Sequence, residues 1–256
     1  MNVREWPVAF FDDDYLKIYR PQLTPERTRE EVDFIDSALG LSKGAAVLDL
    51  ACGIGRHAIG MALRGYRVTG LDFNARYLEI AAQDASRAGA TVEWKQGDMR
   101  ALSFDGEFSA AYSYFTSFGY YDDAENDAVL GRIARSLALG GRFLLDMANR
   151  DWVLTHPQQR TWNSYPNDTL VMEEISLDLR SSRVTSRQIL IPPRGGSQVV
   201  KTFDLRVYTC AELAALMDRH GLEVREVWGG ADRSPYSTES RRLVMLAERV
   251  VQAGKP

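Results

Sequence analysis

Glycines and an acidic residue meet in one stretch of this 256-residue chain, where the segment 49–55 reads DLACGIG. A short apolar run, AVL at 46–48, precedes it, and a helical pattern follows it. Glycines between a strand and a helix let a ligand approach the backbone, and the helix N-terminus favours negative charge. Taken alone the motif is ambiguous, because it also fits the loose dinucleotide-binding fingerprint and a tight turn that binds nothing.

Three aspartates narrow the choice of ligand. Asp49 precedes the glycines, Asp72 ends the second predicted strand, and Asp98 follows the third. An anion at Asp49 would repel a pyrophosphate but suits an amino group, whereas Asp72 can accept both hydroxyls of a ribose. Asp98 can accept from an adenine amino group. A ligand with an adenosine, an amine and little negative charge is indicated, and S-adenosylmethionine, whose sulfonium is a cation, fits.

The elements that must position these residues alternate regularly. Short apolar runs predict buried parallel strands, and 3.6-residue periodicity predicts the helices between them. We expect strands near 46–50, 67–71, 91–94, 108–114 and 142–146, with helices at 55–64, 75–88 and 123–138. Thr24-Pro25-Glu26 opens an earlier helix that stops at Gly40. This order predicts a doubly wound α/β sheet with its strand ends along one edge.

The pattern changes after Asn149. Apolar residues alternate with polar ones at 175–179, 189–191 and 203–207, separated by turns at Ser181-Ser182 and Gly195-Gly196. Period-2 alternation predicts antiparallel strands with one wet face. We therefore predict one domain formed by 1–150 and 208–256, with an antiparallel β insertion at 151–207 that serves as a lid or substrate wall. The insertion also offers a surface for a homodimer.

The chain then returns to the first pattern. Thr209 and Glu212 form a predicted capping box, and the helix that they open ends at His220-Gly221. Two final strands at 222–228 and 242–247 have a connection too short for a crossover helix, so this pair should be antiparallel.

These motifs resemble those of class I S-adenosylmethionine-dependent methyltransferases. The family's loop is Asp/Glu-x-Gly-x-Gly-x-Gly, and this chain departs from it with Ala51 at the first glycine. The similarity continues in GLDFN at 70–74 and QGDM at 96–99, and it covers about 45–147 and 209–248. It implies a Rossmann-like doubly wound seven-stranded sheet with the last strand antiparallel. It also implies S-adenosylmethionine as cofactor and S-adenosylhomocysteine as product.

The resemblance assigns cofactor contacts residue by residue. The implied cofactor-binding residues are Asp49, Ala51, Gly53 and Gly55 at the methionine end, Asp72 and Phe73 at the ribose, Asp98 and Met99 at the adenine, and Tyr114 and Phe115 after the fourth strand.

The acceptor is expected beside the segment 112–121, YSYFTSFGYY, which leaves the fourth strand. It lacks the Asp/Asn-Pro-Pro-Tyr/Phe signature of enzymes that methylate nucleic-acid amines and resembles small-molecule enzymes such as amino-sugar N-methyltransferases. We predict positioning roles in catalysis for Tyr19 and Tyr120, the latter standing where the sugar enzymes often have histidine. The predicted substrate-binding residues are Tyr15, Phe118, Asn149, Arg150 and Tyr236.

Composition bounds the remaining possibilities. A net charge of −4 disfavours a nucleic-acid surface, and the chain has no apolar run long enough to span a membrane. The N-terminus lacks a signal-peptide core, so we expect a soluble cytoplasmic protein. The three histidines and two cysteines have no metal-site spacing, so no metal is expected.

We therefore predict in-line transfer of a methyl group to an N or O atom of a small molecule. Two alternatives stay open, a methyltransferase acting on a peptide or RNA and an S-adenosylmethionine-binding protein without transfer activity.

Overall fold

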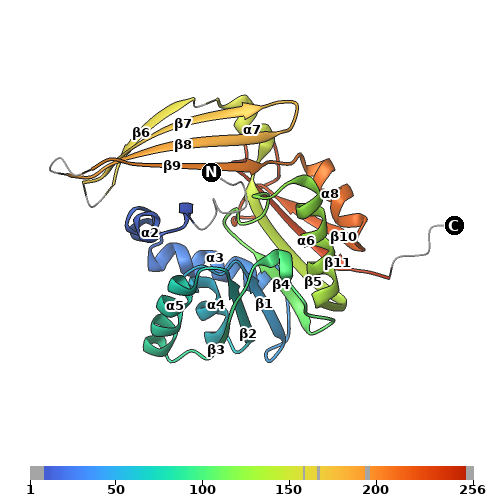
Figure 1. The fold of residues 1–256 in the computed structure, drawn as a ribbon. Helices are drawn as coiled ribbons and strands as arrows, with labels where there is room; N and C mark the ends of the chain where they lie inside the picture. The colour runs from blue at the N-terminus through green and yellow to red at the C-terminus, as the bar shows by residue number, and fades with distance from the viewer. Residues whose placement is uncertain (1–8, 158, 166–167, 194–196, 252–256) are drawn as a thin grey trace.

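The computed structural model describes residues 9–157, 159–165, 168–193 and 197–251. Its main body is a seven-stranded sheet in the order β10-β11-β5-β4-β1-β2-β3 (Figure 1). The strands of this sheet are β1 (Ala46–Leu50), β2 (Arg67–Asp72), β3 (Val92–Gln96), β4 (Phe108–Ser113), β5 (Leu137–Ala148), β10 (Leu222–Trp228) and β11 (Arg242–Arg249).

Strand directions match the sequence prediction. The neighbours from β3 to β5 pair in parallel, whereas β11 runs antiparallel to both β5 and β10. The register pairs Leu50 with Leu71 and Asp72 with Gln96, so the strand ends lie at one edge. The predicted Rossmann-like doubly wound sheet with an antiparallel last strand is confirmed.

Helices cover both faces of this sheet. One face packs against α3 (Pro25–Leu39), α4 (Arg56–Leu63) and α5 (Ala75–Ala88), and the other against α6 (Asp123–Ser136) and α8 (Cys210–Asp218). The predicted helix starts are also present, because Thr24 caps α3 and Thr209 forms a capping box with Glu212 at α8. No helix within the described residues is both long and apolar enough to cross a membrane.

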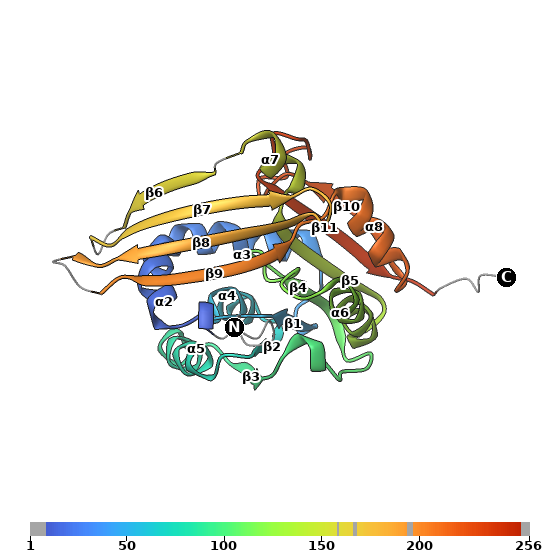
Figure 2. The same cartoon turned by 45° about the horizontal axis from the view of Figure 1, so that its top comes forward.

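A second, four-stranded antiparallel sheet follows β5 in the order β6-β7-β8-β9. Its strands are β6 (Arg160–Ser164), β7 (Leu170–Asp178), β8 (Arg183–Ile191) and β9 (Val199–Arg206). The sheet lies over the main body, and the short helix α2 (Asp13–Tyr19) is held between the two (Figures 1 and 2). One face of the second sheet thus lies toward the edge of the main sheet at which the parallel strands end (Figures 1 and 2).

The sequence prediction missed two elements of this region, β6 and the helix α7 (Arg150–Thr155). Strand β6 carries one large apolar side chain, Trp162, which is 76% exposed, so it has no inside-outside alternation. Helix α7 has six residues, too few for a readable helical period. The turn predicted at Gly195-Gly196 lies outside the described residues.

Candidate active site

A pocket opens at the carboxyl ends of the parallel strands, beside α2. Residues from the N-terminal segment, the glycine loop, the ends of β1 and β2, and the segment after β4 surround it. Its lining consists of Phe11, Tyr15, Leu16, Leu23, Asp49, Ala51, Cys52, Gly53, Ile54, Arg56, His57, Asp72, Phe73, Tyr77, Met99, Tyr114, Phe115, Thr116, Ser117, Tyr120 and Tyr121. Most of the predicted cofactor residues and two of the predicted acceptor-side tyrosines are brought together here.

The two glycines of the loop have different tasks. Both have left-handed backbones, with φ of 55° at Gly53 and 75° at Gly55. A Cβ at Gly55 would stand 2.4 Å from the Trp94 ring, so this glycine is required by packing. A Cβ at Gly53 would approach only the ring of Tyr77, at 4.0 Å, so the space beside Gly53 belongs to the pocket. Ala51 also has a positive φ, 60°, where the family pattern has glycine.

Asp72 ties this loop to the neighbouring strand. Its Oδ2 accepts the Gly53 N–H at 2.8 Å, and its Oδ1 accepts the Asn74 N–H at 2.8 Å. Each carboxylate oxygen has about two lone pairs, so one on each oxygen remains for a ligand hydroxyl.

Asp49 is a buried carboxylate at the end of β1. The Tyr112 hydroxyl donates to its Oδ2 at 3.0 Å. Burial raises the pKa of Asp49 to about 7, although Tyr112 and Arg56 act in the opposite direction. A ligand ammonium beside this carboxyl would favour its ionised form.

Cofactor affinity should therefore increase with pH around neutrality. A carboxyl of pKa about 7 is roughly one-tenth ionised at pH 6 and about three-quarters ionised at pH 7.5, so S-adenosylhomocysteine should bind about eightfold more tightly at the higher pH. Calorimetry at the two pH values checks this. Asp49→Asn should flatten the dependence, and a wild-type affinity that stays constant would contradict the amine-binding role.

Asp98 is engaged by a neighbour instead of lining the pocket. The Arg100 guanidinium donates to both of its oxygens at 2.7–3.2 Å, and the Tyr121 hydroxyl reaches Oδ1 at 3.4 Å. Arg100 also bonds Glu125 at 3.0 Å and lies over the Tyr121 ring. The adenine role of Asp98 stays a prediction, whereas the adjacent Met99 lines the pocket.

The aromatic side of the pocket comes from three parts of the chain. The rings of Tyr15 and Tyr19 on α2 lie 4.4 Å apart, and Phe11 contacts both Tyr15 and Tyr120 at 5.0 and 5.7 Å between centroids. Tyr19 lies behind Tyr15, where the Gln188 amide of the second sheet donates to its hydroxyl at 3.0 Å. Tyr19 is thus placed to support Tyr15 from outside the lining.

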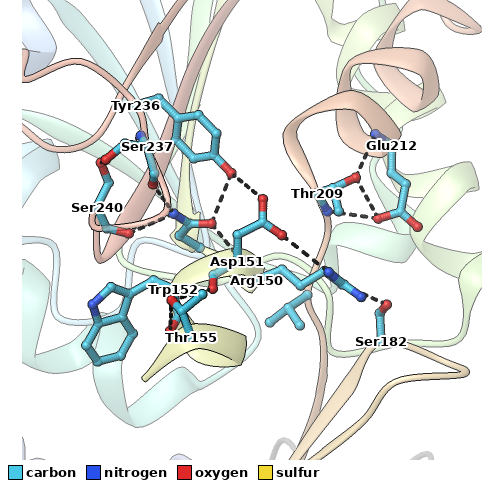
Figure 3. Close-up of polar contacts among 12 residues, drawn as sticks. Arg150, Asp151, Trp152, Thr155, Ser182, Thr209, Glu212, Tyr236, Ser237 and Ser240 are labelled. Carbon is cyan, nitrogen blue, oxygen red and sulfur yellow. Dashed lines mark hydrogen bonds and ion pairs between the residues drawn. The ribbon is translucent and has the colours of Figure 1, made fainter. Parts of the chain in front are cut away.

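Four predicted substrate residues lie elsewhere. Phe118 is buried in the main core beside Tyr208. Arg150 and Tyr236 belong to a polar cluster at the start of α7 (Figure 3). There Tyr236 donates to Asn149 at 3.0 Å, and Arg150 donates to Ser182 at 3.0 Å. These contacts join α7 to the β10–β11 connection and the β7–β8 turn, and a role in acceptor binding stays a prediction.

The sequence analysis did not predict the ion pair between Arg56 and Glu31, which lies at the start of α4. Arg56 and His57, at the start of α4, both bond Glu31 of α3 and both line the pocket. Burial lowers the pKa of His57 to about 4, so the ring is neutral at neutral pH. The position of Arg56 directly after the loop was a usable signal, but its partner is 25 residues away in sequence.

Comparisons with known proteins agree with this geometry. A family model described as a methyltransferase domain matches residues 47–141. The cypemycin N-terminal methyltransferase of a Streptomyces species is 29% identical over 210 residues, covering 80% of this chain and 84% of that protein.

Two solved structures share the whole fold. An S-adenosylmethionine-dependent methyltransferase from Clostridium acetobutylicum has a TM-score of 0.78 at 16% identity, covering 93% of this chain and 96% of its own. CalS10, an amino pentose methyltransferase from Micromonospora echinaspora solved with S-adenosylmethionine bound, has a TM-score of 0.66 at 21% identity, covering 93% and 98%.

The chain is a class I S-adenosylmethionine-dependent methyltransferase. S-adenosylmethionine is its cofactor, and the pocket fits this molecule. Open space beside Gly53 admits a ligand against the loop, and Asp72 retains acceptor capacity for hydroxyls. The buried Asp49 carboxyl suits an amine.

Proposed function

We propose that this chain transfers the methyl group of S-adenosylmethionine to the nitrogen of an amine on a small-molecule acceptor. The cofactor, when bound, supplies a methyl group already activated on a sulfonium. The chain's part is to hold the acceptor in line with that methyl group and to exclude water, which is worth several kcal/mol of barrier.

The side chains on the acceptor side support nitrogen over oxygen, and this observation carries the proposal: Phe11, Tyr15 and Tyr120 line the pocket there, and none of them is a base at neutral pH. Burial raises the pKa of Tyr15 and of Tyr120 well above the usual phenol value, so both are protonated at neutral pH. His57 has a pKa near 4 and is bonded to Glu31, which makes it a poor base. Asp49 and Asp72 are held at the strand ends by Tyr112 and by backbone N–H groups. An acceptor that needs no enzymic base, such as a neutral amine, suits this pocket.

Tyr120 and Tyr15 then contribute to acceptor binding through the shape of the wall that they form and through the polarity of their rings. Their rings and that of Phe11 form an aromatic wall, and an ammonium approaching such rings is attracted by the ring quadrupoles. Tyr19 is proposed as a positioning residue, because it contacts Tyr15 and is fixed by Gln188. The name of the Micromonospora relative, which specifies an amino pentose, supports an amine-bearing acceptor.

The test is a panel of amines and phenols of graded pKa, with S-adenosylhomocysteine release measured and the products analysed by mass spectrometry. If the chain uses neutral amines, the midpoint of the pH–rate profile should move with the pKa of each amine. A midpoint that stays at one value for all amines, or methylation of phenols alone, would overturn the proposal. Peptides with a free N-terminus belong in the panel, since the cypemycin enzyme is named for N-terminal methylation.

We also propose that the outer face of the second sheet pairs with a second copy of this chain. Register places Trp162, Met172, Ile189 and Val200 in one cross-strand row, and three of them are 47–76% exposed. Exposed apolar rows on a flat sheet face mark association surfaces.

The charges beside this row favour a second copy. The adjacent cross-strand row is Arg160, Glu174 and Arg187, in which the sign alternates. Glu174 pairs with Arg160 and Arg187 of its own copy at 3.1 and 3.5 Å, and a twofold axis through this face places the row beside the same alternating row of the second copy.

Sedimentation velocity should show a dimer at micromolar concentration and a monomer for the double variant Trp162→Lys, Met172→Lys. The matched control is Leu63→Lys, which places a charge on a leucine of α4 that is 57% exposed, and it should remain dimeric. A monomeric wild-type protein, or a double variant that stays dimeric, would contradict this interface.

A further inference from the structure

The second sheet contributes no residue to the pocket lining, because every described residue that lines the pocket lies before position 122. It nevertheless contacts the segment that carries Tyr120. Tyr120 packs against a cluster of apolar side chains on β8 and β9, in which Val184 and Leu205 are buried, and its ring centroid lies 6.3 Å from that of Phe203. One link between the second sheet and the pocket therefore runs through Tyr120.

The residue before Tyr120 is fixed by the end of β9. The carbonyl of the buried Gly119 accepts the Arg206 N–H at 2.8 Å. Gly119 has a φ of 105°, and a Cβ on it would stand 2.4 Å from the Arg206 carbonyl oxygen. A backbone atom cannot move aside as a flexible side chain can. Strand β9 therefore approaches the segment this closely only because position 119 is a glycine.

Tyr121, on the other side, is fixed by the start of β8. Arg183 Nη1 donates to the Tyr121 carbonyl at 3.1 Å, and Asn126 Nδ2 of α6 donates to the same carbonyl at 2.9 Å. The Arg183 guanidinium is itself held, since its Nε donates to Asp204 on β9. Arg183 and Arg206 lie opposite one another in the register of the two strands, so both contacts come from one end of the second sheet.

We propose that Gly119 and Arg183 are positioning residues, through which the second sheet fixes the orientation of Tyr120 toward the acceptor. The rotamers open to a side chain depend on the backbone, so fixing the main chain on both sides of Tyr120 restricts the direction of its ring. Such order matters for in-line transfer, since a misplacement of about 1 Å can lower the rate about 100-fold. The inference rests on the acceptor role proposed above for Tyr120.

The position of the ring can be tested without an acceptor. With 3-fluorotyrosine in place of Tyr120 and S-adenosylhomocysteine bound, fluorine NMR should give one narrow signal. Gly119→Ala should shift or broaden that signal, because the new Cβ displaces β9. Arg183→Met should do so to a smaller extent, because Asn126 still holds the Tyr121 carbonyl. Thermal unfolding shows whether each variant is folded.

Each variant has a matched control. Gly106→Ala introduces a Cβ at a φ of 69° that meets nothing within 4 Å among the described residues, so it adds backbone strain without displacement. Arg225→Met removes an arginine that pairs with Glu248 at 3.5 Å across β10 and β11, as Arg183 pairs across β8 and β9. Both controls should leave the signal unchanged. If the signal of Gly119→Ala matches that of the unsubstituted segment, the second sheet does not position this ring.

Kinetics separate a failure of this inference from a failure of the proposed function. With the amine of the panel that is methylated fastest, Gly119→Ala should lower kcat/KM about 10- to 100-fold and change the affinity for S-adenosylhomocysteine by less than about twofold. In a Tyr120→Ala protein the same change should cost little, since the ring that it misplaces is already absent. An equal loss in that protein would overturn the inference. A displaced ring with unchanged turnover of every amine would support the positioning and overturn the acceptor role of Tyr120.

Discussion

Replacing Gly53 with valine should abolish S-adenosylhomocysteine binding while leaving the protein folded. The protein itself has room for the side chain, since the nearest atom to a new Cβ is 4.0 Å away on Tyr77. Because this open space is part of the pocket, the valine side chain would occupy the position in which a ligand lies against the loop. Overpacking of this kind costs roughly 1–3 kcal/mol or more, and about 3 kcal/mol corresponds to a loss of at least about 100-fold. Calorimetry gives the affinity and thermal unfolding the stability.

Backbone strain must be separated from this steric effect. Valine at a φ of 55° costs about 1–2 kcal/mol, which is small beside an ordinary folding stability of roughly 5–15 kcal/mol. Gly44→Val is the matched control, because Gly44 has a φ of 83°, open space around its Cβ and no place in the pocket lining. It should lose similar stability and keep its affinity. A folded Gly53→Val protein that binds normally would show that the loop does not contact the cofactor.

The neighbouring glycine gives the opposite phenotype. A Cβ at Gly55 meets the Trp94 ring at 2.4 Å and Ala81 at 2.8 Å, so Gly55→Ala should lower the unfolding temperature. The sequence pattern assigned both glycines to the cofactor, because spacing cannot distinguish a glycine that a ligand requires from one that a tryptophan requires.

The fold could be predicted because its signals are local. Buried strands, capped helices and turn glycines are each encoded in a few consecutive residues, as at Thr24 and at the Thr209–Glu212 capping box. Strand order then followed from the family resemblance and from the short connection between the last two strands. Strand β6 was not predicted, because its one large apolar side chain, Trp162, faces solvent. The backbone pairing of β6 with β7 cannot be recognised from the residue types of the strand.

The site was predicted where its residues sit at strand ends, and less well where tertiary contacts choose the partner. Glu31 and Arg56 meet only because α3 packs on α4, and neither helix pattern indicates that pairing. Asp98 was assigned to adenine from its strand position, but Arg100, two residues on, bonds its carboxylate. Asn149 and Tyr236, which were expected near the acceptor, bond one another in the cluster at α7 outside the pocket lining, and their role in acceptor binding stays a prediction.

Replacing Asp72 should also cause a large loss of affinity for the nucleoside part of the cofactor. Its two oxygens each accept one backbone N–H, from Gly53 and Asn74, and each retains capacity for a ribose hydroxyl. We expect Asp72→Ala to weaken binding of 5′-methylthioadenosine by about 2 kcal/mol or more, roughly 30-fold, which is the order for hydrogen bonds to a charged acceptor. Asp72→Asn keeps the size of the side chain and should lose nearly as much, because an amide offers one acceptor oxygen in place of two.

If Asp72 only shaped the glycine loop, its replacement would weaken binding to a similar extent. The ligand must therefore be varied as well, to distinguish this role from a direct hydrogen bond to the ribose. The 2′-deoxy analogue of 5′-methylthioadenosine should bind the wild-type protein more weakly than the parent, whereas the two should bind Asp72→Asn almost equally. That coupling is what a direct hydrogen bond produces in a double-mutant cycle. Asp178→Asn is the matched control, because Asp178 accepts the N–H two residues later, from Arg180 at 3.0 Å, at a site outside the pocket lining. If Asp72→Asn still discriminates between the two nucleosides as the wild type does, Asp72 shapes the loop and does not bind the ribose.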